Sequence, residues 1–127
     1  MATIQIIKKN KERIFRGKKL EDLKQLDVRE FSKLVKSRSR RSLLRNYDVI
    51  EKFVKKCNER SAKGKQIRTH DRELIIVPNM VDRTIFIHNG KEFQKVEITE
   101  FMLGHRLGEF SMTRKIAKHA AKTAKKK

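Results

Sequence analysis

The sequence is short of cysteine, proline and long apolar runs, and each shortage excludes a class of protein. Cys57 is the one cysteine, so no internal disulfide can form, and without Cys or His companions at ligand spacing it cannot anchor zinc. We expect Cys57 to be a small buried apolar residue. No stretch approaches the ~18 consecutive apolar residues of a membrane-spanning helix, and no apolar secretory core follows Met1. The sequence therefore predicts a cytoplasmic protein without a membrane partner.

Acidic residues are few relative to basic ones. The 127 residues include 34 Lys and Arg against 15 Asp and Glu, a formal net charge of +19. So much charge of one sign repels itself unless a polyanion neutralises it, which makes nucleic acid the expected partner. Only 37% of residues are hydrophobic while 39% are charged, which predicts one modest core. We expect a single RNA-binding domain over residues 12–113, an arm over 1–11 and a flexible basic tail over 114–127.

Three helices are predicted in the first half of the chain. Leu20, Leu23 and Leu26 recur at three-residue spacing and align on one helical face. Asp27 and Glu30 have the spacing of a capping box at the start of a second helix. A longer amphipathic helix is predicted from an apolar stripe at helical spacing, which consists of Leu43, Tyr47, Ile50, Val54 and Cys57. Leu44 and Phe53 widen this stripe. A basic loop around Gly64 should follow it.

The second half has the pattern of strands. A β-branched segment starting at residue 66 should form a strand that closes before Pro78. Asn89-Gly90 favours a two-residue type I′ turn between two further strands. Alternation about that turn predicts one core face, with Ile85, Ile87, Val96 and Ile98, and a mixed aromatic and cationic face, with Phe86, His88, Lys91, Phe93 and Lys95. The fold class is therefore α+β.

One short helix is expected after the hairpin. Thr99 is a plausible N-cap, Leu103, Leu107 and Phe110 have helical spacing, and Gly108 suits a helix end. Gly104 would then lie inside the helix, where it costs about 1 kcal/mol relative to alanine. A large group close to its backbone would account for that cost.

Two cationic motifs are candidates for contact with RNA. The segment KSRSRRSLLR contains five cations and no acid, and the planar fork of arginine suits phosphate. The alternative is a solvated charged helix face. Arg68, His70 and Arg72 alternate along the first predicted strand, which would place them on one side of the sheet; an edge strand protected by charges has the same pattern.

The histidines suggest acid–base chemistry only weakly. His88 and His105 could cleave RNA as a pair, but no nucleophile–base pair or paired carboxylate stands at suggestive spacing. GHRLG lacks the Gly-Lys-Ser/Thr of a phosphate loop. We expect no enzyme, no cofactor, no metal and no small-molecule substrate. A general DNA-binding architectural protein remains the alternative, because the helices around SRSRRSLLR could imitate a helix-turn-helix.

Three consecutive motifs carry a resemblance to a known family. IIVPNM, IFIHNGKEFQKVEIT and EFMLGHRLGEFSMTRK closely resemble the small-subunit ribosomal protein S19 family. FRGKKLEDL, SRSRRSLLR and IRTHDRELIIVP are similar to its archaeal and eukaryotic branch, called S15 in eukaryotic cytosolic ribosomes. The resemblance covers roughly residues 13 to 119.

The resemblance implies a three-stranded sheet with helices, bound to rRNA in the head of the small ribosomal subunit beside ribosomal protein S13. It implies RNA-facing roles at matching positions, and a close-approach and a helix-end role for Gly104 and Gly108. The C-terminal IAKHAAKTAKKK departs from the branch's longer glycine- and proline-containing tail, although its lysines could still neutralise phosphates. Together, motifs and resemblance predict RNA contacts at Lys36, Arg38, Arg40, Arg41, Arg45, Lys63, Lys65, Arg68, His70, Arg72, His88, Asn89, Lys91, His105, Arg106, Thr113, Arg114, Lys115, Lys118 and His119.

Overall fold

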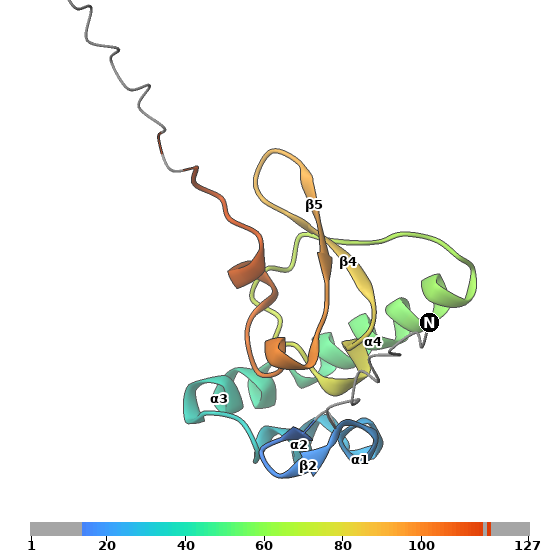
Figure 1. The fold of residues 1–127 in the computed structure, drawn as a ribbon, viewed down its shortest axis with the longest axis vertical. Helices are drawn as coiled ribbons and strands as arrows, with labels where there is room; N and C mark the ends of the chain where they lie inside the picture. Colours follow the sequence, from blue (N-terminus) through green and yellow to red (C-terminus); the bar gives the residue numbers. More distant parts are fainter. Residues whose placement is uncertain (1–13, 116, 118–127) are drawn as a thin grey trace, which may run out of the picture.

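The protein is a set of N-terminal helices from which a small sheet projects (Figure 1). A computed structural model describes residues 14–115 and 117. The helices are α1 (Leu20–Gln25), α2 (Val28–Ser32), α3 (Ser37–Arg45) and α4 (Tyr47–Ala62). The strands are β1 (Ile14–Phe15), β2 (Lys18–Lys19), β3 (Ile67–Thr69), β4 (Thr84–His88) and β5 (Phe93–Glu97), and short 3-10 turns span η1 (Pro78–Met80), η2 (Glu100–Met102) and η3 (Leu107–Phe110). The predicted α+β class is confirmed.

The first two helices lie where the sequence predicts them. Leu20 and Leu23 of α1 are buried, and α2 begins directly after Asp27. The predicted capping box is absent, because the side chain of Asp27 makes no cap hydrogen bond. Its carboxylate lies 3.4 Å from the Tyr47 hydroxyl, whose single proton is donated to Glu51 Oε1 at 2.6 Å. The Asp27 carboxylate therefore lies beside α4 and does not cap α2.

The third predicted helix is two helices, α3 and α4, which meet at Asn46. Asn46 leaves helical geometry with φ −105° and ψ 23°, and this break ends the continuous stripe. Leu43, Ile50, Phe53 and Cys57 are buried as predicted, while Leu44 is 51% exposed. The cationic segment predicted to surround the start of one helix instead contains all of α3, together with its N-cap residue Lys36.

The three-stranded sheet has the order β3-β4-β5. β3 runs parallel to β4, with Ile67 opposite Ile85, and β4 runs antiparallel to β5. The predicted strand from residue 66 to 77 is wrong beyond Thr69. Its apolar end, Leu74 to Val77, is buried and pairs with the GHRLG segment: Ile76 N donates to His105 O at 2.9 Å, and Leu107 N donates to Leu74 O at 3.0 Å.

The hairpin between β4 and β5 closes through four residues, 89–92, and not two. Gly90 has φ +99°, but Asn89 lies outside the left-handed region and its Oδ1 accepts hydrogen bonds from the backbone N–H groups of Lys91 and Glu92, at 3.0 and 2.8 Å. His88 therefore pairs with Phe93, two positions away from the register of a two-residue turn. A shift of two keeps every side chain on its own face. Both predicted faces are confirmed, except that Lys91 lies in the loop.

The predicted helix after Thr99 is wrong. Two 3-10 turns replace it, and Gly104 lies between them at φ +78°. Gly108 falls inside η3 and does not end a helix. Both glycines do permit close approach, since a Cβ on Gly104 would lie 3.2 Å from Val35 Cγ1, and one on Gly108 would lie 3.0 Å from the Arg72 carbonyl oxygen. The backbone pairing with residues 74–76 explains why a regular helix does not form here.

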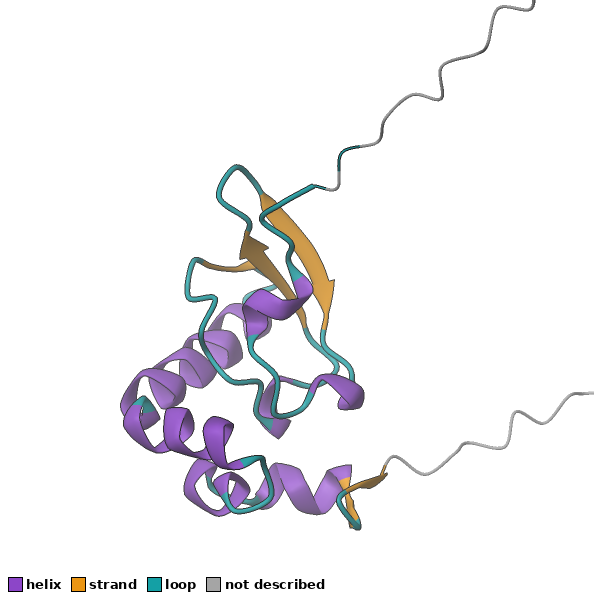
Figure 2. Cartoon of the chain, turned by 90° about the vertical axis from the view of Figure 1, so that its left-hand side faces the viewer, coloured by secondary structure: helices purple, strands orange, loops and turns teal. Residues whose placement is uncertain are grey.

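The helices lie against the sheet (Figure 2), and one core of buried side chains joins them. Leu23, Phe31 and Ile50 from the helices and Ile85 and Ile87 from the sheet are fully buried in it. Cys57 is buried too, as predicted, and has no disulfide partner. The opposite face of the sheet is left outside this core.

Candidate nucleic-acid interface

Two segments about 65 residues apart form one basic surface. Ser39 Oγ of α3 donates a hydrogen bond to the Gly104 carbonyl at 3.1 Å, and Arg106 Nη2 donates to Ser42 Oγ at 3.4 Å. These contacts hold the GHRLG segment against the polar side of α3. The sequence predicted RNA contacts in both segments, and the structure brings them together.

The exposed cations of this surface follow helical spacing. Arg38, Arg41 and Arg45 stand at i, i+3 and i+7 of α3, which places them on one side of the helix, and all three are exposed. His105 is exposed and Arg106 half-buried beside the same helix. We call these five residues the α3 surface. Lys36, also exposed, immediately precedes α3.

Arg40 has a different role from its neighbours. Its Nε donates to the Ser32 carbonyl at 3.1 Å and its Nη2 donates to the Lys33 carbonyl at 3.2 Å. The guanidinium thus satisfies carbonyls at the C-terminal end of α2, where a positive charge is also favourable. Arg40 belongs to the contact between α2 and α3.

Arg72 is directed into the fold. Its Nη1 donates to the His88 carbonyl at 2.6 Å, and its Nη2 donates to the carbonyls of Gly108, at 2.8 Å, and Ser111. Because β3 ends at Thr69, the expected alternation does not extend to Arg72. The expectation that Arg72 lies in one row with Arg68 and His70 is therefore wrong, and contact of Arg72 with RNA stays a prediction.

Arg68 and His70 do share the outer face of the sheet with the hairpin. The Arg68 guanidinium lies 5.4 Å from the centre of the Phe93 ring, and the His70 ring lies 4.4 Å from that of His88. Asn89 and exposed Lys91 occupy the adjoining loop. Asn89 is engaged with backbone N–H groups through its Oδ1, so its contribution there is to hold the loop in shape.

His105 is paired within its own segment. Its Nδ1 lies 2.8 Å from Glu109 Oε2, and its ring meets Phe110 edge-on at 6.0 Å. The rings beside His88 are those of His70 and Phe93, so the two histidines that sequence reasoning considered as a catalytic pair have different sets of neighbours.

A third basic area covers the end of α4. Lys63 and Lys65, both predicted, line a hollow of about 380 Å³ together with Lys56, Glu59 and Arg60. Sequence reasoning missed Lys56 and Arg60, although their i, i+4 spacing places them on one helical face.

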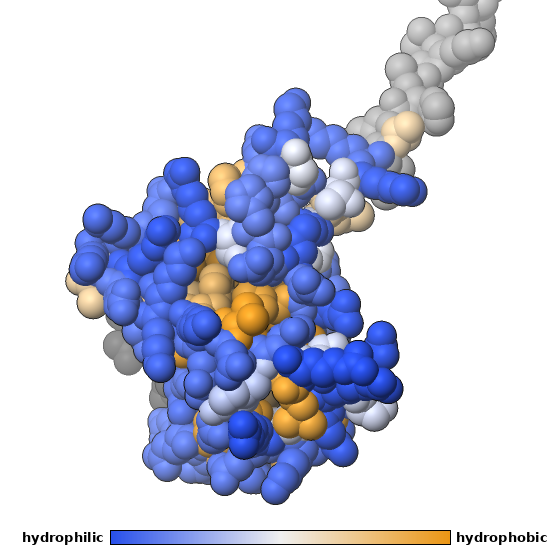
Figure 3. Space-filling view, turned by 180° about the vertical axis from the view of Figure 1, so that it is seen from behind, coloured by the Kyte–Doolittle hydropathy of each residue, from blue (hydrophilic) through white to orange (hydrophobic). Residues whose placement is uncertain are grey.

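Figure 3 shows the molecule from behind, hydrophilic over most of its area, with apolar side chains visible in a central hollow and a smaller patch below it.

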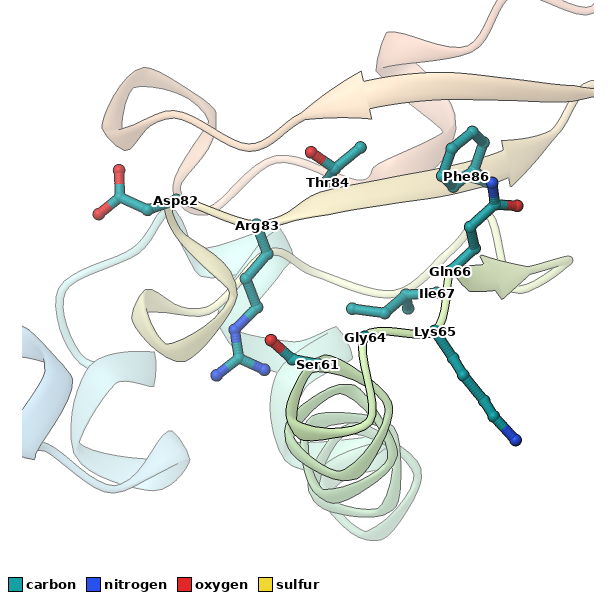
Figure 4. A pocket seen from close by; sticks show the side chains of 9 residues that line it. All are labelled: Ser61, Gly64, Lys65, Gln66, Ile67, Asp82, Arg83, Thr84 and Phe86. Atoms are coloured by element: carbon teal, nitrogen blue, oxygen red, sulfur yellow. The ribbon is translucent and has the colours of Figure 1, made fainter.

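A second hollow of about 310 Å³ lies between the end of α4 and the start of β4 (Figure 4). Arg83 borders it and donates from Nη2 to Asn58 Oδ1 at 2.6 Å, while its buried Nη1 has no hydrogen-bond partner among the described residues. Ser61 and Lys65 are also at its border, but Lys65 extends away from it. The residues that line this hollow are Ser61, Gly64, Lys65, Gln66, Ile67, Asp82, Arg83, Thr84 and Phe86.

The pKa values of Tyr47 and Cys57 are shifted, and both shifts have structural causes. The hydrogen bond that Tyr47 donates to Glu51 Oε1 at 2.6 Å is the main reason that the pKa of Tyr47 is raised to about 12. Burial raises the pKa of the Cys57 thiol, opposed by nearby Arg83. A thiol that resists ionisation is unreactive as a nucleophile, which supports the packing role predicted for Cys57.

The start of the C-terminal tail emerges from the core at Ser111, which is buried. Thr113, Arg114 and Lys115 beyond it are exposed. Lys118 and His119, also predicted to contact RNA, lie outside the described residues, as does the predicted arm over residues 1–11.

Within residues 14–115, no cluster of His, Cys, Asp or Glu is arranged to hold a metal ion. None of the described helices is long and apolar enough to cross a membrane.

The fold and its surfaces define a class: a small, strongly basic α+β protein with cations and aromatic rings displayed around a rigid core. A model of the family described as ribosomal protein S19 matches residues 41–119. The chain belongs to the ribosomal protein S19 family. It is therefore an rRNA-binding ribonucleoprotein component of the small ribosomal subunit, acting in translation.

Proposed function

We propose that the protein is a structural, non-enzymatic constituent of the head of the small ribosomal subunit. The α3 surface supports this most strongly: Arg38, Arg41 and Arg45 are exposed on one side of a helix that is fixed to the GHRLG segment. Guanidinium groups so placed can each bind a phosphate in two-pronged fashion. The rigid core sets their spacing before RNA arrives.

The remaining basic areas extend the contact with RNA. We assign further phosphate contacts to two groups of cations. One group lies at the end of α4 and consists of Lys56, Arg60, Lys63 and Lys65; the other follows η3 and consists of Arg114 and Lys115. Ribosomal protein S13 is the neighbouring protein that we expect, and the cytoplasm the compartment. Arg40 and Arg72 take part indirectly, by holding α2 and the segment of Gly108 and Ser111 in place.

The test combines location with mechanism. A tagged full-length chain should sediment with small subunits through a gradient. Its affinity for an rRNA head fragment should fall by about 10³ or more between 50 and 200 mM salt if it neutralises about six phosphates. A chain absent from small subunits, or a flat salt response, would contradict the proposal.

Two rivals are separated by related measurements. A general DNA-binding protein should bind duplex DNA and the rRNA fragment comparably at matched salt, whereas we expect a strong preference for rRNA. An RNA-cleaving enzyme should turn over RNA and lose that turnover on replacement of His88 and His105 by alanine. We expect background turnover from both chains.

A further inference from the structure

Three aromatic rings form a cluster on the outer face of the sheet. The ring centres of His70 and His88 are 4.4 Å apart, those of His88 and Phe93 are 4.9 Å apart, and those of His70 and Phe93 are 5.1 Å apart. Register explains the cluster: His88 is paired with Phe93, and His70 follows Thr69, which is paired with Ile87. We call these three residues the ring cluster. Each comes from a different strand or its immediate end.

The ring cluster is not needed to cover the core. The core lies on the other face, beneath Ile85, Ile87 and Val96. His70 is exposed, and His88 and Phe93 are half-buried. His88 and Phe93 lie at the ends of β4 and β5 nearest the turn, and this hairpin projects away from the helices (Figures 1 and 2). Aromatic surface in this position contacts solvent in the isolated protein, so a ligand that covers it gains apolar contact.

The cluster is held in shape by the backbone. His88 Nδ1 accepts a hydrogen bond from Gly90 N at 3.0 Å, which orients the ring. The His88 carbonyl accepts from Arg72 Nη1 at 2.6 Å, which ties β4 to the segment after β3. The surface therefore loses little conformational freedom when a ligand binds.

Charges around the cluster are mixed. The cations on the adjoining strands and loop are Arg68, Lys91 and Lys95, and the carboxylates are Asp71, Glu92 and Glu97. Lys95 Nζ forms an ion pair with Glu97 Oε1 at 3.2 Å. This area differs from the α3 surface, which has three exposed arginines on one side. A phosphate chain alone has little reason to prefer it, whereas the flat face of a base can stack on aromatic rings whatever its sequence.

We propose that the ring cluster is a stacking site for an unpaired nucleobase of rRNA. The base stacks on the face of Phe93, and the His70 ring, inclined to Phe93 by 71°, meets the edge of the base. Arg68, 5.4 Å from the Phe93 ring centre, stacks on the base or contacts its phosphate. This inference rests on the proposed function, because it concerns how the protein contacts rRNA. It adds a contact whose strength depends on the bases and only weakly on salt.

The experiment measures the affinity of the full-length chain for a short single-stranded oligoribonucleotide and for an abasic oligomer of equal length and charge, and compares the two affinities. The wild type should bind the base-containing strand about tenfold more tightly. Phe93→Leu, which keeps apolar bulk but removes the aromatic face, should abolish that preference, while Phe93→Tyr should retain it. The salt dependence should be the same for all three proteins, because no phosphate contact is removed.

Phe101→Ala is the matched control. Phe101 is an aromatic residue that is 84% exposed on η2, outside the cluster, so its loss should leave the preference intact. Equal binding of the two oligomers by the wild type, or an unchanged preference in Phe93→Leu, would overturn the proposal. If the wild type binds the two oligomers equally and Phe93→Leu fails to enter small subunits, the proposal is also overturned, because that outcome indicates a protein partner on this face.

Different results would refute the stacking site and the proposed function. A wild type that binds the rRNA head fragment with steep salt dependence but has no preference for bases refutes the stacking site alone. A wild type that does not bind the head fragment refutes the proposed function.

Discussion

Among the described residues outside the apolar core, Arg72 is the one whose replacement we expect to lower the free energy of unfolding most. Its guanidinium donates to three backbone carbonyls, those of His88, Gly108 and Ser111. These belong to the hairpin, to η3 and to the segment that leaves the core. Replacing Arg72 with alanine leaves all three carbonyls without this donor.

The magnitude follows from those three bonds. A hydrogen bond to a charged group contributes about 1.5–3 kcal/mol when buried. Since Arg72 is half-buried, we discount each bond to about 1 kcal/mol for solvent screening. The free energy of unfolding should then fall by about 3 kcal/mol, which lowers the melting temperature by about 12 °C or more in a domain of this size.

Thermal and urea unfolding of Arg72→Ala, followed by far-UV circular dichroism, tests this estimate. Arg68→Ala is the matched control, because Arg68 is an exposed arginine of the same segment whose hydrogen bonds go to the Gln66 side chain; its change should stay within about 0.5 kcal/mol. Arg72→Lys should fall between the two, since an ammonium cannot reproduce the planar fork. Equal stability of Arg72→Ala and wild type would refute the reasoning.

Three further predictions concern binding, ionisation and packing. Arg41→Gln should reduce the slope of log affinity against log salt by about 0.7 to 0.9, with unchanged stability, whereas Arg40→Gln should lower the melting temperature with little change of slope; identical behaviour of the two would contradict the geometry. Tyr47, the one tyrosine, should titrate at a pKa of about 12 by phenolate absorbance, and Glu51→Gln should bring it closer to 10. Because the folded pKa is raised, the stabilisation is present below pH ~10 and is lost as pH rises towards 12; a wild-type midpoint near 10 while circular dichroism still shows the fold would refute this. Gly108→Ala should cost about 1–3 kcal/mol in chemical unfolding, because its Cβ would lie 3.0 Å from the Arg72 carbonyl; no loss of stability would show that this contact can relax.

The predictions that held depend on periodicity. Ile85, Ile87, Val96 and Ile98 share the buried face of the hairpin, because side chains alternate in any strand and a register error of two does not change the face. Leu20 and Leu23 are buried in α1 for the same kind of reason. Short-range patterns of this kind need no knowledge of the neighbouring elements.

The predictions that failed depended on a neighbour far away in the sequence. The helix expected after Thr99 gave way to backbone pairing between residues 104–108 and 72–76. Arg72 left the expected row because its strand ended early, and three distant carbonyls accept its hydrogen bonds. Local spacing carries no information about either partner.

The polyanionic partner, the single core and the alternating faces of the hairpin could be predicted from the sequence, since charge and hydrophobic period act through composition and local geometry. Which cations remain available to RNA depends instead on contacts between elements that are distant in the sequence. Arg38, Arg40, Arg41 and Arg45 are all exposed, but the guanidinium of Arg40, like that of half-buried Arg72, binds backbone carbonyls of other elements. An arginine beside an unpaired carbonyl is held by the protein, and one without such a carbonyl remains in solvent, so its role depends on what the fold places next to it.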